Sequence, residues 1–469
     1  MLTPIRVRGR RRKHPDDGAP TPTSTPAPSG PKGGRPFLSH QAKLNSSQAR
    51  SHKRARLLIA KPTQPRKSIL ESLPVELIEK IFLYSQNVNF ARCSSSLAAA
   101  VSSERIFRAL ILLAFWDDSA MPAGTTRASE AAISRILRPV EYIPISHAER
   151  RNLQDSILRC KWCTVQRLLA QLPDLMNLTL QRHWFGAGMT MSAVEEESLT
   201  QFLAQKGDAR VFTGTDANTN PSTLAINPLV SITVTHHETD QSTTYPVLGV
   251  LLIPDKLFHG LFCPDQVHYL ETLRIASGWN RPDLIKPTVA VSREYLQNGI
   301  HAALVQNNAE ALATLLKIDE YHFRSEIQSL QPTGGVPYTV PAEHFRTAVR
   351  VGRHDATLFQ LLLRASAESV PADDSEITGW AVALDNAFGG WLLELMLRLP
   401  QQIEAARANP AEDALFYLGQ ANGQKELGRR YLREVLGVEA LGCWMGESVF
   451  DVSGQWKVVA EGSSATRNP

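Results

Sequence analysis

The stretch Leu73-Pro-Val-Glu-Leu-Ile-Glu-Lys-Ile-Phe82 combines the start signals of a helix with one broad apolar face. Proline suits the first turn of a helix, because its missing N–H would have no acceptor within the helix there. Glu76 follows, where a carboxylate interacts favourably with the positive end of the helix dipole. Apolar residues then recur at helical spacing, namely Leu73, Leu77, Ile78, Ile81 and Phe82. The pattern predicts an amphipathic helix, and most such helices only pack a core.

The order of residues in this helix resembles the F-box, whose first helix opens with Leu-Pro-x-Glu-Leu or -Ile and carries an Ile-Phe or Ile-Leu pair one turn later. The matching positions are Leu73, Pro74, Glu76, Leu77, Ile78, Ile81 and Phe82. The segments Asn87–Val101 and Ile106–Leu110 resemble the second half of F-boxes of the filamentous-fungal type. Phe90 and Ala91 stand where Leu-Pro is commoner, and the Trp usual before Ile106 is missing. The resemblance covers residues 70–115.

This resemblance implies a three-helix F-box over residues 68–118, which would dock on the Skp-type adaptor of a cullin–RING ubiquitin ligase. The chain would then be the substrate-recognition subunit of an SCF-type ligase, with no catalytic activity of its own. The side chains expected to bind the adaptor are Leu73, Pro74, Leu77, Ile78, Ile81 and Phe82. Some of them must serve the F-box core, and we expect the adaptor-facing set to be Leu73, Pro74, Ile78 and Phe82.

The composition fits a globular protein inside the cell. The chain has 469 residues, of which 43% are hydrophobic, enough for two or three domains. Its apolar runs fall well short of the roughly 20 residues that cross a membrane, and no apolar stretch follows the basic N-terminus as in a secretory signal. Five cysteines without regular spacing fit a reducing compartment. We therefore expect the nucleus or cytoplasm and no membrane partner.

Residues 1–67 form a tail of different composition. They hold 16 Lys or Arg and two Asp, a net charge of +14, so the net +4 of the whole chain leaves −10 for the remainder. Ten prolines among Ser, Thr and Gly predict disorder. Candidate nuclear-import residues are Arg10, Arg11, Arg12, Lys13, Lys53, Arg54 and Arg56. A solvated tail without a specific reader is the alternative, and nucleic-acid binding is disfavoured because Phe37 is the tail's single aromatic residue.

Residues 130–460 read as mainly helical, with one interruption. Ser156–Cys160 and Thr164–Leu169 belong to paired amphipathic helices within residues 145–186. Residues 225–255 differ, because Leu229–Thr235 alternates apolar and polar residues and Tyr245–Ile253 is rich in β-formers. This insertion is predicted to be a β-hairpin or small sheet near 229–253.

The C-terminal half contains a weak internal echo. Ile300–Leu304, Phe345–Val349 and Trp380–Leu384 each carry small Ala residues and precede a turn and a Leu-rich segment. The echo resembles degenerate ankyrin-like helix pairs, without the Thr-Pro-Leu-His turn and with irregular spacing. Stacked pairs bury a continuous core and leave an extended surface for partners. The region is thus the expected recognition domain for an unknown protein substrate, and a helical bundle with coincidental spacing is the alternative.

Catalytic and metal motifs are weak. Cys160 and Cys163 form the single Cys-x-x-Cys, without the further ligands that structural zinc requires or the preceding strand of a thioredoxin-type site. Gly334-Gly335 and Gly389-Gly390 lack the Lys-Ser/Thr of a phosphate loop, and no Gly-x-Ser-x-Gly elbow occurs. We expect no enzyme, no metal, no cofactor and no small-molecule ligand. Two alternatives are a ligase-independent nuclear scaffold, and an enzyme in residues 187–300 with polar residues around a deep pocket beside the predicted hairpin.

Overall fold

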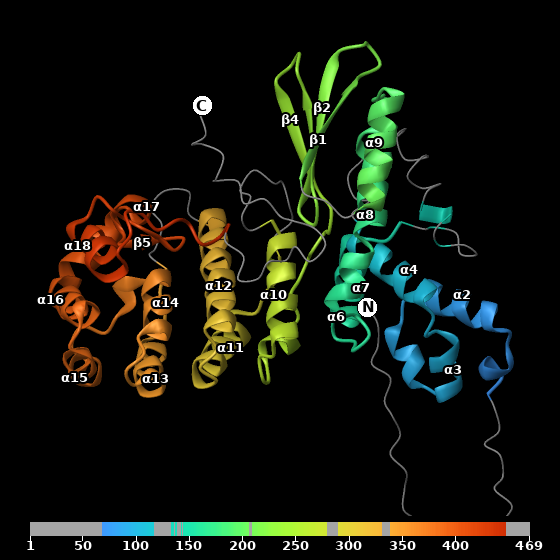
Figure 1. Cartoon of the computed structure of the whole chain (residues 1–469). Helices are drawn as coiled ribbons and strands as arrows, with labels where there is room; N and C mark the ends of the chain where they lie inside the picture. Colours follow the sequence, from blue (N-terminus) through green and yellow to red (C-terminus); the bar gives the residue numbers. More distant parts are fainter. Residues whose placement is uncertain are drawn as a thin grey trace, which may run out of the picture. The chain divides into compact units, whose positions relative to one another are not determined.

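The computed structural model describes residues 68–116, 133–135, 137, 142, 144–205, 209–278, 289–330 and 338–446, without the side chains of 325–330. The tail, with its predicted disorder and its seven candidate import residues, lies outside the described residues. The described residues belong to one compact unit. It is mainly helical with a small antiparallel sheet (Figure 1). Within the described part, no helix has the length and hydropathy required to cross a membrane.

The first helices follow the sequence pattern closely. The elements are η2 (Leu70–Ser72), α2 (Val75–Ser85), η3 (Val88–Arg92), α3 (Ser95–Ala100) and α4 (Glu104–Phe115). Pro74 is the N-cap of α2, and its carbonyl accepts hydrogen bonds from the N–H groups of Leu77 and Ile78. Ser94 and Ser103 cap α3 and α4 through their side chains. The helices predicted near 90–100 and 103–115 are confirmed.

The next helices are α6 (His147–Leu158), α7 (Val165–Ala170) and α8 (Leu172–His183). Helix α4 packs directly on α6 and α8, so its buried residues share a core with them. The Gln154 side chain donates to the carbonyl oxygens of Ala114, at 2.8 Å, and Gly249, at 2.6 Å. Arg108 of α4 makes two hydrogen bonds of 2.7 Å to the Asp174 carboxylate of α8. The first helices are therefore fixed on the helical domain by apolar burial and by directional contacts.

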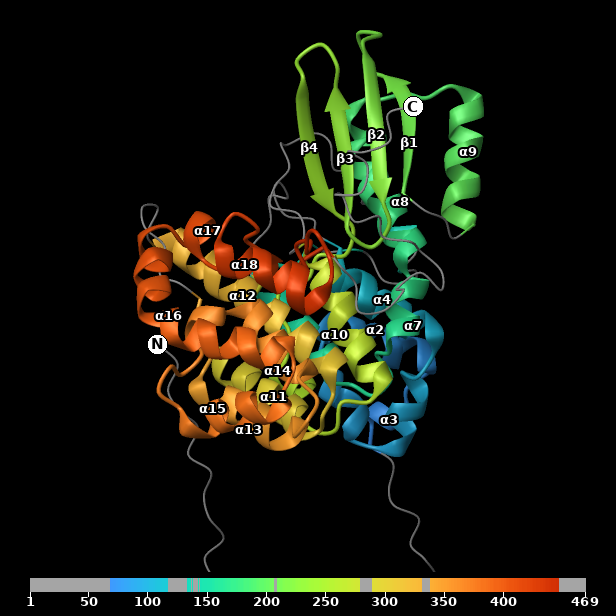
Figure 2. The same cartoon turned by 60° about the vertical axis from the view of Figure 1, so that its left-hand side comes forward.

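Residues 210–246 form a four-stranded antiparallel meander, following η4 (Phe185–Ala187) and α9 (Ala193–Ala204). Its strands are β1 (Arg210–Thr215), β2 (Pro221–Asn227), β3 (Ser231–His236) and β4 (Gln241–Pro246). Alternate residues such as Phe212 and Leu224 are buried, and α8 and α9 contact this sheet (Figure 2). Phe202 of α9 packs edge-on against Phe212, with ring centroids 5.7 Å apart.

The predicted small sheet is confirmed, and the predicted strand Leu229–Thr235 falls largely on β3. The second predicted strand, Tyr245–Ile253, shares only Tyr245 and Pro246 with β4. Strands β1 and β2 were not predicted, because their outward positions are Thr, Val and Ala, which blur the apolar–polar alternation. The apolar run Val247–Ile253 is not a strand; it is buried chain with one parallel bridge, between Leu252 and Ala290. A fully buried segment has apolar residues on every side, so its pattern resembles that of a core strand.

Helix pairs stack through the second half of the chain (Figure 1). The elements are η5 (Asp255–Phe258), α10 (Pro264–Ala276), α11 (Arg293–Val305), α12 (Ala309–Leu330), α13 (Ala342–Gly352), α14 (Thr357–Ala365), η6 (Ala367–Ser369), α15 (Ser375–Leu384) and α16 (Ala387–Ala408). Helix α11 pairs with α12, α13 with α14, and α15 with α16, while α11 packs on α13 and α13 on α15. The three echoed segments fall on α11, α13 and α15, so the predicted helix pairs are present.

Close backbone approach explains one glycine in the last pair. A Cβ atom on Gly389 of α16 would lie 2.3 Å from the carbonyl oxygen of Ala381 in α15. Only glycine lets the two helices come this near.

Buried carboxylates anchor the last described elements, α17 (Pro410–Asp413), β5 (Phe416–Tyr417), β6 (Gln420–Ala421), α18 (Glu426–Arg430) and the π-helical turn η7 (Tyr431–Leu436). Glu320 of α12 accepts from the Leu418 N–H at 2.8 Å and from the Trp444 indole at 3.2 Å. Glu368 accepts from the Leu415 N–H at 2.7 Å. Burial raises the pKa of both carboxyl groups. These contacts fix an irregular segment on the helix stack.

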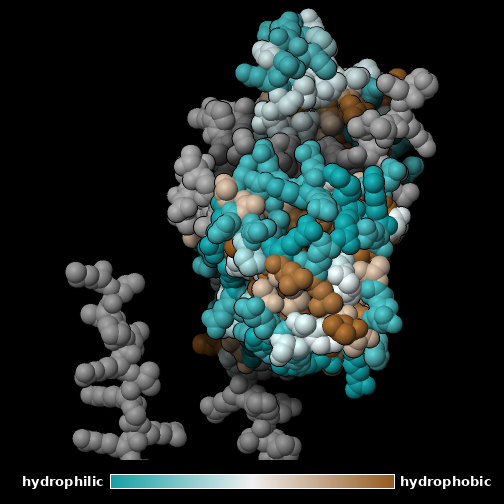
Figure 3. Space-filling model, turned by 90° about the vertical axis from the view of Figure 1, so that its left-hand side faces the viewer, coloured by the Kyte–Doolittle hydropathy of each residue, from teal (hydrophilic) through white to brown (hydrophobic). Residues whose placement is uncertain are grey.

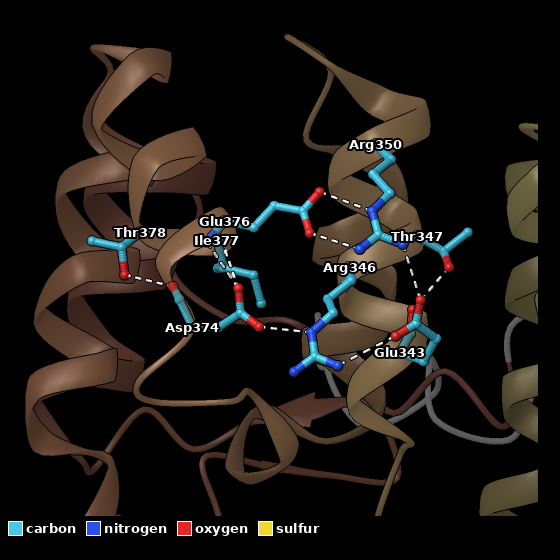
Figure 4. A network of polar contacts seen from close by, with 8 residues as sticks. All are labelled: Glu343, Arg346, Thr347, Arg350, Asp374, Glu376, Ile377 and Thr378. Atoms are coloured by element: carbon cyan, nitrogen blue, oxygen red, sulfur yellow. Dashed lines mark hydrogen bonds and ion pairs between the residues drawn. The ribbon is translucent and has the colours of Figure 1, made fainter.

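An exposed polar network joins α13 to α15 (Figure 4). Arg346 donates to Asp374 at 2.7 Å, and Arg350 makes two hydrogen bonds of 2.8 Å to Glu376. Asp374 also caps α15, accepting from the N–H groups of Glu376 and Ile377. The Arg346 guanidinium holds the pKa of Asp374 below its ordinary value. Exposed ion pairs stabilise little individually, so the cap is the stronger part of this network.

Replacing the cap should therefore cost stability where replacing its neighbour should not. We expect Asp374→Ala to lower the free energy of unfolding by about 1–2 kcal/mol, because α15 loses its N-cap. Asp373→Ala is the matched control, since Asp373 is exposed and does not cap the helix. Urea unfolding followed by circular dichroism measures both. Equal effects of the two substitutions would contradict the role of the cap.

A second network, buried between α11, α12 and α13, contains a neutral histidine. The Gln297 amide nitrogen donates to the Asp319 carboxylate at 2.6 Å. The amide oxygen of Gln297 therefore points toward His344 Nε2, at 2.8 Å. His344 Nε2 must therefore carry the proton, while its buried Nδ1 has no hydrogen-bond partner among the described residues. Tyr338 and Arg293 also donate to Asp319. Burial, with the nearby His301 adding to it, lowers the pKa of His344 to about 4.

The lowered pKa of His344 predicts that the free energy of unfolding falls as the pH falls. Its ordinary pKa is near 6.5 and its folded pKa about 4, so the unfolded chain takes up the proton first as the pH falls. We expect His344 to contribute a loss of about 2 kcal/mol between pH 8 and pH 5. His344→Gln should remove this part of the pH dependence, while His301→Gln, on the exposed neighbour, should keep most of it, because burial is the larger cause of the lowered pKa. Denaturant unfolding at several pH values tests this, and parallel curves for wild type and His344→Gln would contradict it.

A candidate protein-docking surface on α2

One side of α2 is sealed inside the protein. Ile78 and Phe82 are each 3% exposed and pack with α3 and α4. The ring of Phe82 lies 5.7 Å from that of Phe90, between centroids. Glu79 is also buried and forms an ion pair with Arg105 of α4. This side fixes the orientation of α2 and is closed to any partner.

The opposite side carries an exposed apolar stripe. Pro74, Leu77, Ile81 and Tyr84 follow one another at spacings of three or four residues, so they line one side of the helix. Leu77 is 45% exposed, Ile81 39% and Tyr84 51%. The neighbouring exposed apolar side chains are Val75 and Ile69. Of the thirteen large apolar side chains that are exposed in the described chain, five lie between Ile69 and Tyr84. We call Pro74, Leu77, Ile81 and Tyr84 the α2 stripe.

The structure corrects the expected division of these residues. Ile78 and Phe82 were expected to face the adaptor, but they belong to the core of the chain itself. Leu77 and Ile81, which belonged to the wider expected set and not to the narrower one, are exposed. The apolar residues span more of the helix circumference than one contact can bury, and the position of α3 and α4 selects which of them face inward. Of the other two predicted residues, Pro74 is exposed and Leu73 half-buried.

Charged groups border the stripe without interrupting it. Glu76 is exposed in the first turn and Lys80 is half-buried one turn later. Full burial of an aliphatic side chain is worth roughly 1.5–3 kcal/mol, so covering a half-exposed one yields about half as much. Three or four such side chains covered together can form the apolar centre of a larger protein contact.

The cysteine pair has structural partners. Cys160 donates its thiol to the Ser156 carbonyl at 3.3 Å, and the sulfur of buried Cys163 accepts from the Tyr269 hydroxyl at 3.3 Å. Both are free thiols. Across the described residues, no three His, Cys, Asp or Glu side chains are grouped to hold a metal ion.

A polar pocket bears on the enzyme hypothesis. It has a volume of about 840 Å³ and lies between one face of α6 and the segments 252–255 and 289–292. Among its charged side chains, Arg159 and Asp155 of α6 form an ion pair of 2.9 Å. The pocket adjoins α6 and the end of the predicted insertion, within residues 187–300, and does not border strands β3 and β4. The absence of an enzyme stays a prediction, and the enzyme in residues 187–300 stays its alternative.

The helical domain carries a second, smaller apolar surface. Figure 3 faces the α15–α16 end of the chain and shows a hydrophobic group on a mostly hydrophilic surface. The large apolar side chains exposed on these two helices are Val382, at 62%, and Leu397, at 83%. They are fewer than those near α2, so α2 is the stronger docking candidate.

Comparison with known proteins identifies no relative: no family model, no curated protein and no solved structure matches this chain. The assignment of a function therefore depends on the residues themselves and on their arrangement.

The two sides of α2 should respond differently to truncation. Phe82→Ala should lower the free energy of unfolding by about 3–5 kcal/mol, because it leaves a cavity in the core. Ile81→Ala, on the neighbouring exposed position, should change it by no more than about 0.5 kcal/mol. Chemical denaturation of the two variants measures this difference. A larger loss for Ile81→Ala than for Phe82→Ala would reverse the assignment of the two sides.

Proposed function

We propose that the chain is the substrate-recognition subunit of an SCF-type ubiquitin ligase and docks on a Skp-type adaptor through the α2 stripe. The observation that carries the proposal is the exposed stripe itself, located on the helix whose sequence resembles the first helix of an F-box. A helix that only packs a core gains nothing from Leu77, Ile81 and Tyr84 exposed to water. A helix that docks on a partner buries these side chains in the contact.

The contacts of α4 support a role in positioning. The side chain of Phe107 stacks on Trp162, with ring centroids 4.4 Å apart, and Glu104 pairs with Arg167 at 2.6 Å. Together with the Arg108–Asp174 pair, these contacts fix α4, and with it α2, on the helical domain. A ligase subunit must hold its cargo at a defined distance from the adaptor, and such a rigid connection serves this purpose.

Cargo binding is assigned to the helical domain. Its stacked helix pairs offer an extended surface, and we propose that they are degenerate ankyrin-like repeats. A ligase-independent nuclear scaffold would use the same surface, and it differs from the ligase subunit only in having no need of the α2 stripe.

The stripe can be tested in the full chain. Leu77→Asp with Ile81→Asp should reduce co-purification of a co-expressed Skp-type adaptor at least tenfold, because a carboxylate would be buried against an apolar partner. These exposed positions are better suited than Leu73→Ala with Pro74→Ala, which would also affect the start of α2. Val382→Asp with Leu397→Asp is the matched control on another exposed apolar surface and should leave adaptor binding unchanged.

The amount of adaptor retained is read from the purified complex, and circular dichroism confirms that each variant is folded. Undiminished adaptor binding by the Leu77→Asp, Ile81→Asp variant, or no adaptor binding by the wild-type chain, would contradict the ligase proposal and favour the scaffold.

A further inference from the structure

A pocket of about 770 Å³ lies where the end of α6 and the start of α7 face η5 and the start of α10. Its inner wall is formed by buried apolar side chains, among them Leu158, Val165 and Leu257. The volume is within the range of roughly 300–1,000 Å³ that is typical of ligand sites. No adaptor-facing residue of α2 lines it, so the pocket is separate from the docking surface.

Two polar groups of the inner wall, those of Tyr269 and Cys163, satisfy each other. The Tyr269 hydroxyl donates to the sulfur of Cys163 at 3.3 Å. Burial raises the pKa of Cys163 to about 11 and raises the pKa of Tyr269 as well. Both groups therefore stay neutral at physiological pH, and the inner wall suits an apolar group rather than an ion.

Basic side chains dominate the rim. Lys161 and Lys256 line the pocket and are exposed, and Asp265 is the acidic side chain of the lining. The stem of Lys256 is held in place, because its ammonium group donates to the Arg159 carbonyl at 2.7 Å. Burial raises the pKa of the Cys160 thiol in the lining, and the positive charges of Arg92 and Lys256 oppose this rise, so Arg92 adds to the positive charge near the pocket. An occupant with negative charge beside an apolar group matches this distribution.

Apolar surface continues beyond the rim. Leu261, beside the lining residue Gly260, is 81% exposed, and Val305 is 58% exposed. The adjacent Gln306 side chain connects the end of α11 to this loop through the Gly260 carbonyl, at 2.8 Å, and the Phe262 N–H, also at 2.8 Å. These apolar side chains would remain uncovered by a molecule that only fills the pocket. They favour an occupant that extends over the rim, as a peptide does.

We propose that this pocket binds a short acidic peptide segment and takes up one bulky apolar or aromatic side chain of it. The apolar side chain fills the inner wall, the acidic neighbours pair with Lys161 and Lys256, and the peptide backbone passes over Leu261. Such an anchor in a desolvated pocket, surrounded by a charged rim, is a common arrangement in peptide recognition. That the peptide belongs to a ligase substrate rests on the proposed function; the binding chemistry does not.

The test begins with selection from a random dodecapeptide phage library on the full-length chain. We expect enrichment of sequences with one Trp, Phe, Leu or Met among Asp and Glu. Fluorescein-labelled copies of these peptides should bind with an affinity that falls as the salt concentration rises. No enrichment, or enrichment of basic or purely polar sequences, would overturn the proposal.

Two pairs of variants locate the binding. Cys263→Trp fills the pocket from its exposed rim and should weaken binding at least tenfold, while Cys443→Trp, at an exposed cysteine outside the lining, should not. Lys161→Glu should weaken binding at least fivefold, and Arg407→Glu, an exposed charge on α16, should not. Equal affinities of Cys263→Trp and wild type would contradict this site. Displacement of an apolar dye by small aromatic molecules without any peptide binding would identify a small-molecule site instead.

The two proposals fail separately. Peptide binding is measured on the chain alone, without an adaptor, and Cys263→Trp should retain the adaptor that Leu77→Asp with Ile81→Asp loses. Loss of peptide binding with adaptor binding intact would overturn only the pocket proposal. Adaptor failure with intact peptide binding would overturn only the ligase proposal.

Discussion

Every residue of α4 from Ala109 to Phe115 is buried, and this burial connects α2 to the rest of the described chain. Helix α4 contacts α2 on the N-terminal side of the protein and α6 and α8 on the other. Its apolar residues therefore belong to two packing surfaces at once, and neither surface is complete without it. The Arg108–Asp174 and Gln154–Ala114 hydrogen bonds add direction to this contact. The first helices accordingly cannot be removed without exposing the core of the helical domain.

Farther along the chain, buried polar networks also connect segments that are distant in the sequence. Asp319, Glu320 and Glu368 sit among apolar helices and are each satisfied by hydrogen bonds from other segments. A buried carboxylate that lost its partners would cost several kcal/mol. These acids thus specify where the irregular segment after α16 must lie, which apolar packing alone would leave less defined. The β meander, in contrast, is held by α8 and α9 on one face.

The α2 stripe and the pocket are two separate sites on one compact unit, and we propose a different binding role for each. The stripe offers exposed aliphatic and aromatic side chains for a stable protein contact, whereas the pocket offers one apolar cavity with a basic rim. The first suits a permanent partner, and the second suits a short segment that must be released. Helices α4, α6 and α7 connect the two sites. Helix α4 packs on α6, and Glu104 of α4 pairs with Arg167 of α7, so the stripe and the pocket are held on one rigid set of helices.

The sequence by itself determined that the stretch Leu73–Phe82 forms a helix and that the three echoed segments between Ile300 and Leu384 belong to helix pairs, because caps and apolar spacing are local signals. It also marked β3, whereas β4 lies mostly before the second predicted strand, Tyr245–Ile253. Only the tertiary structure decided that Leu77 and Ile81 face outward while Ile78 and Phe82 face inward. The two pairs lie side by side on one broad apolar face, and the packing of α3 and α4 selects the half that is buried. The sequence did not indicate the pocket either, because its lining brings Cys163 next to Tyr269, which lies 106 positions away in the chain.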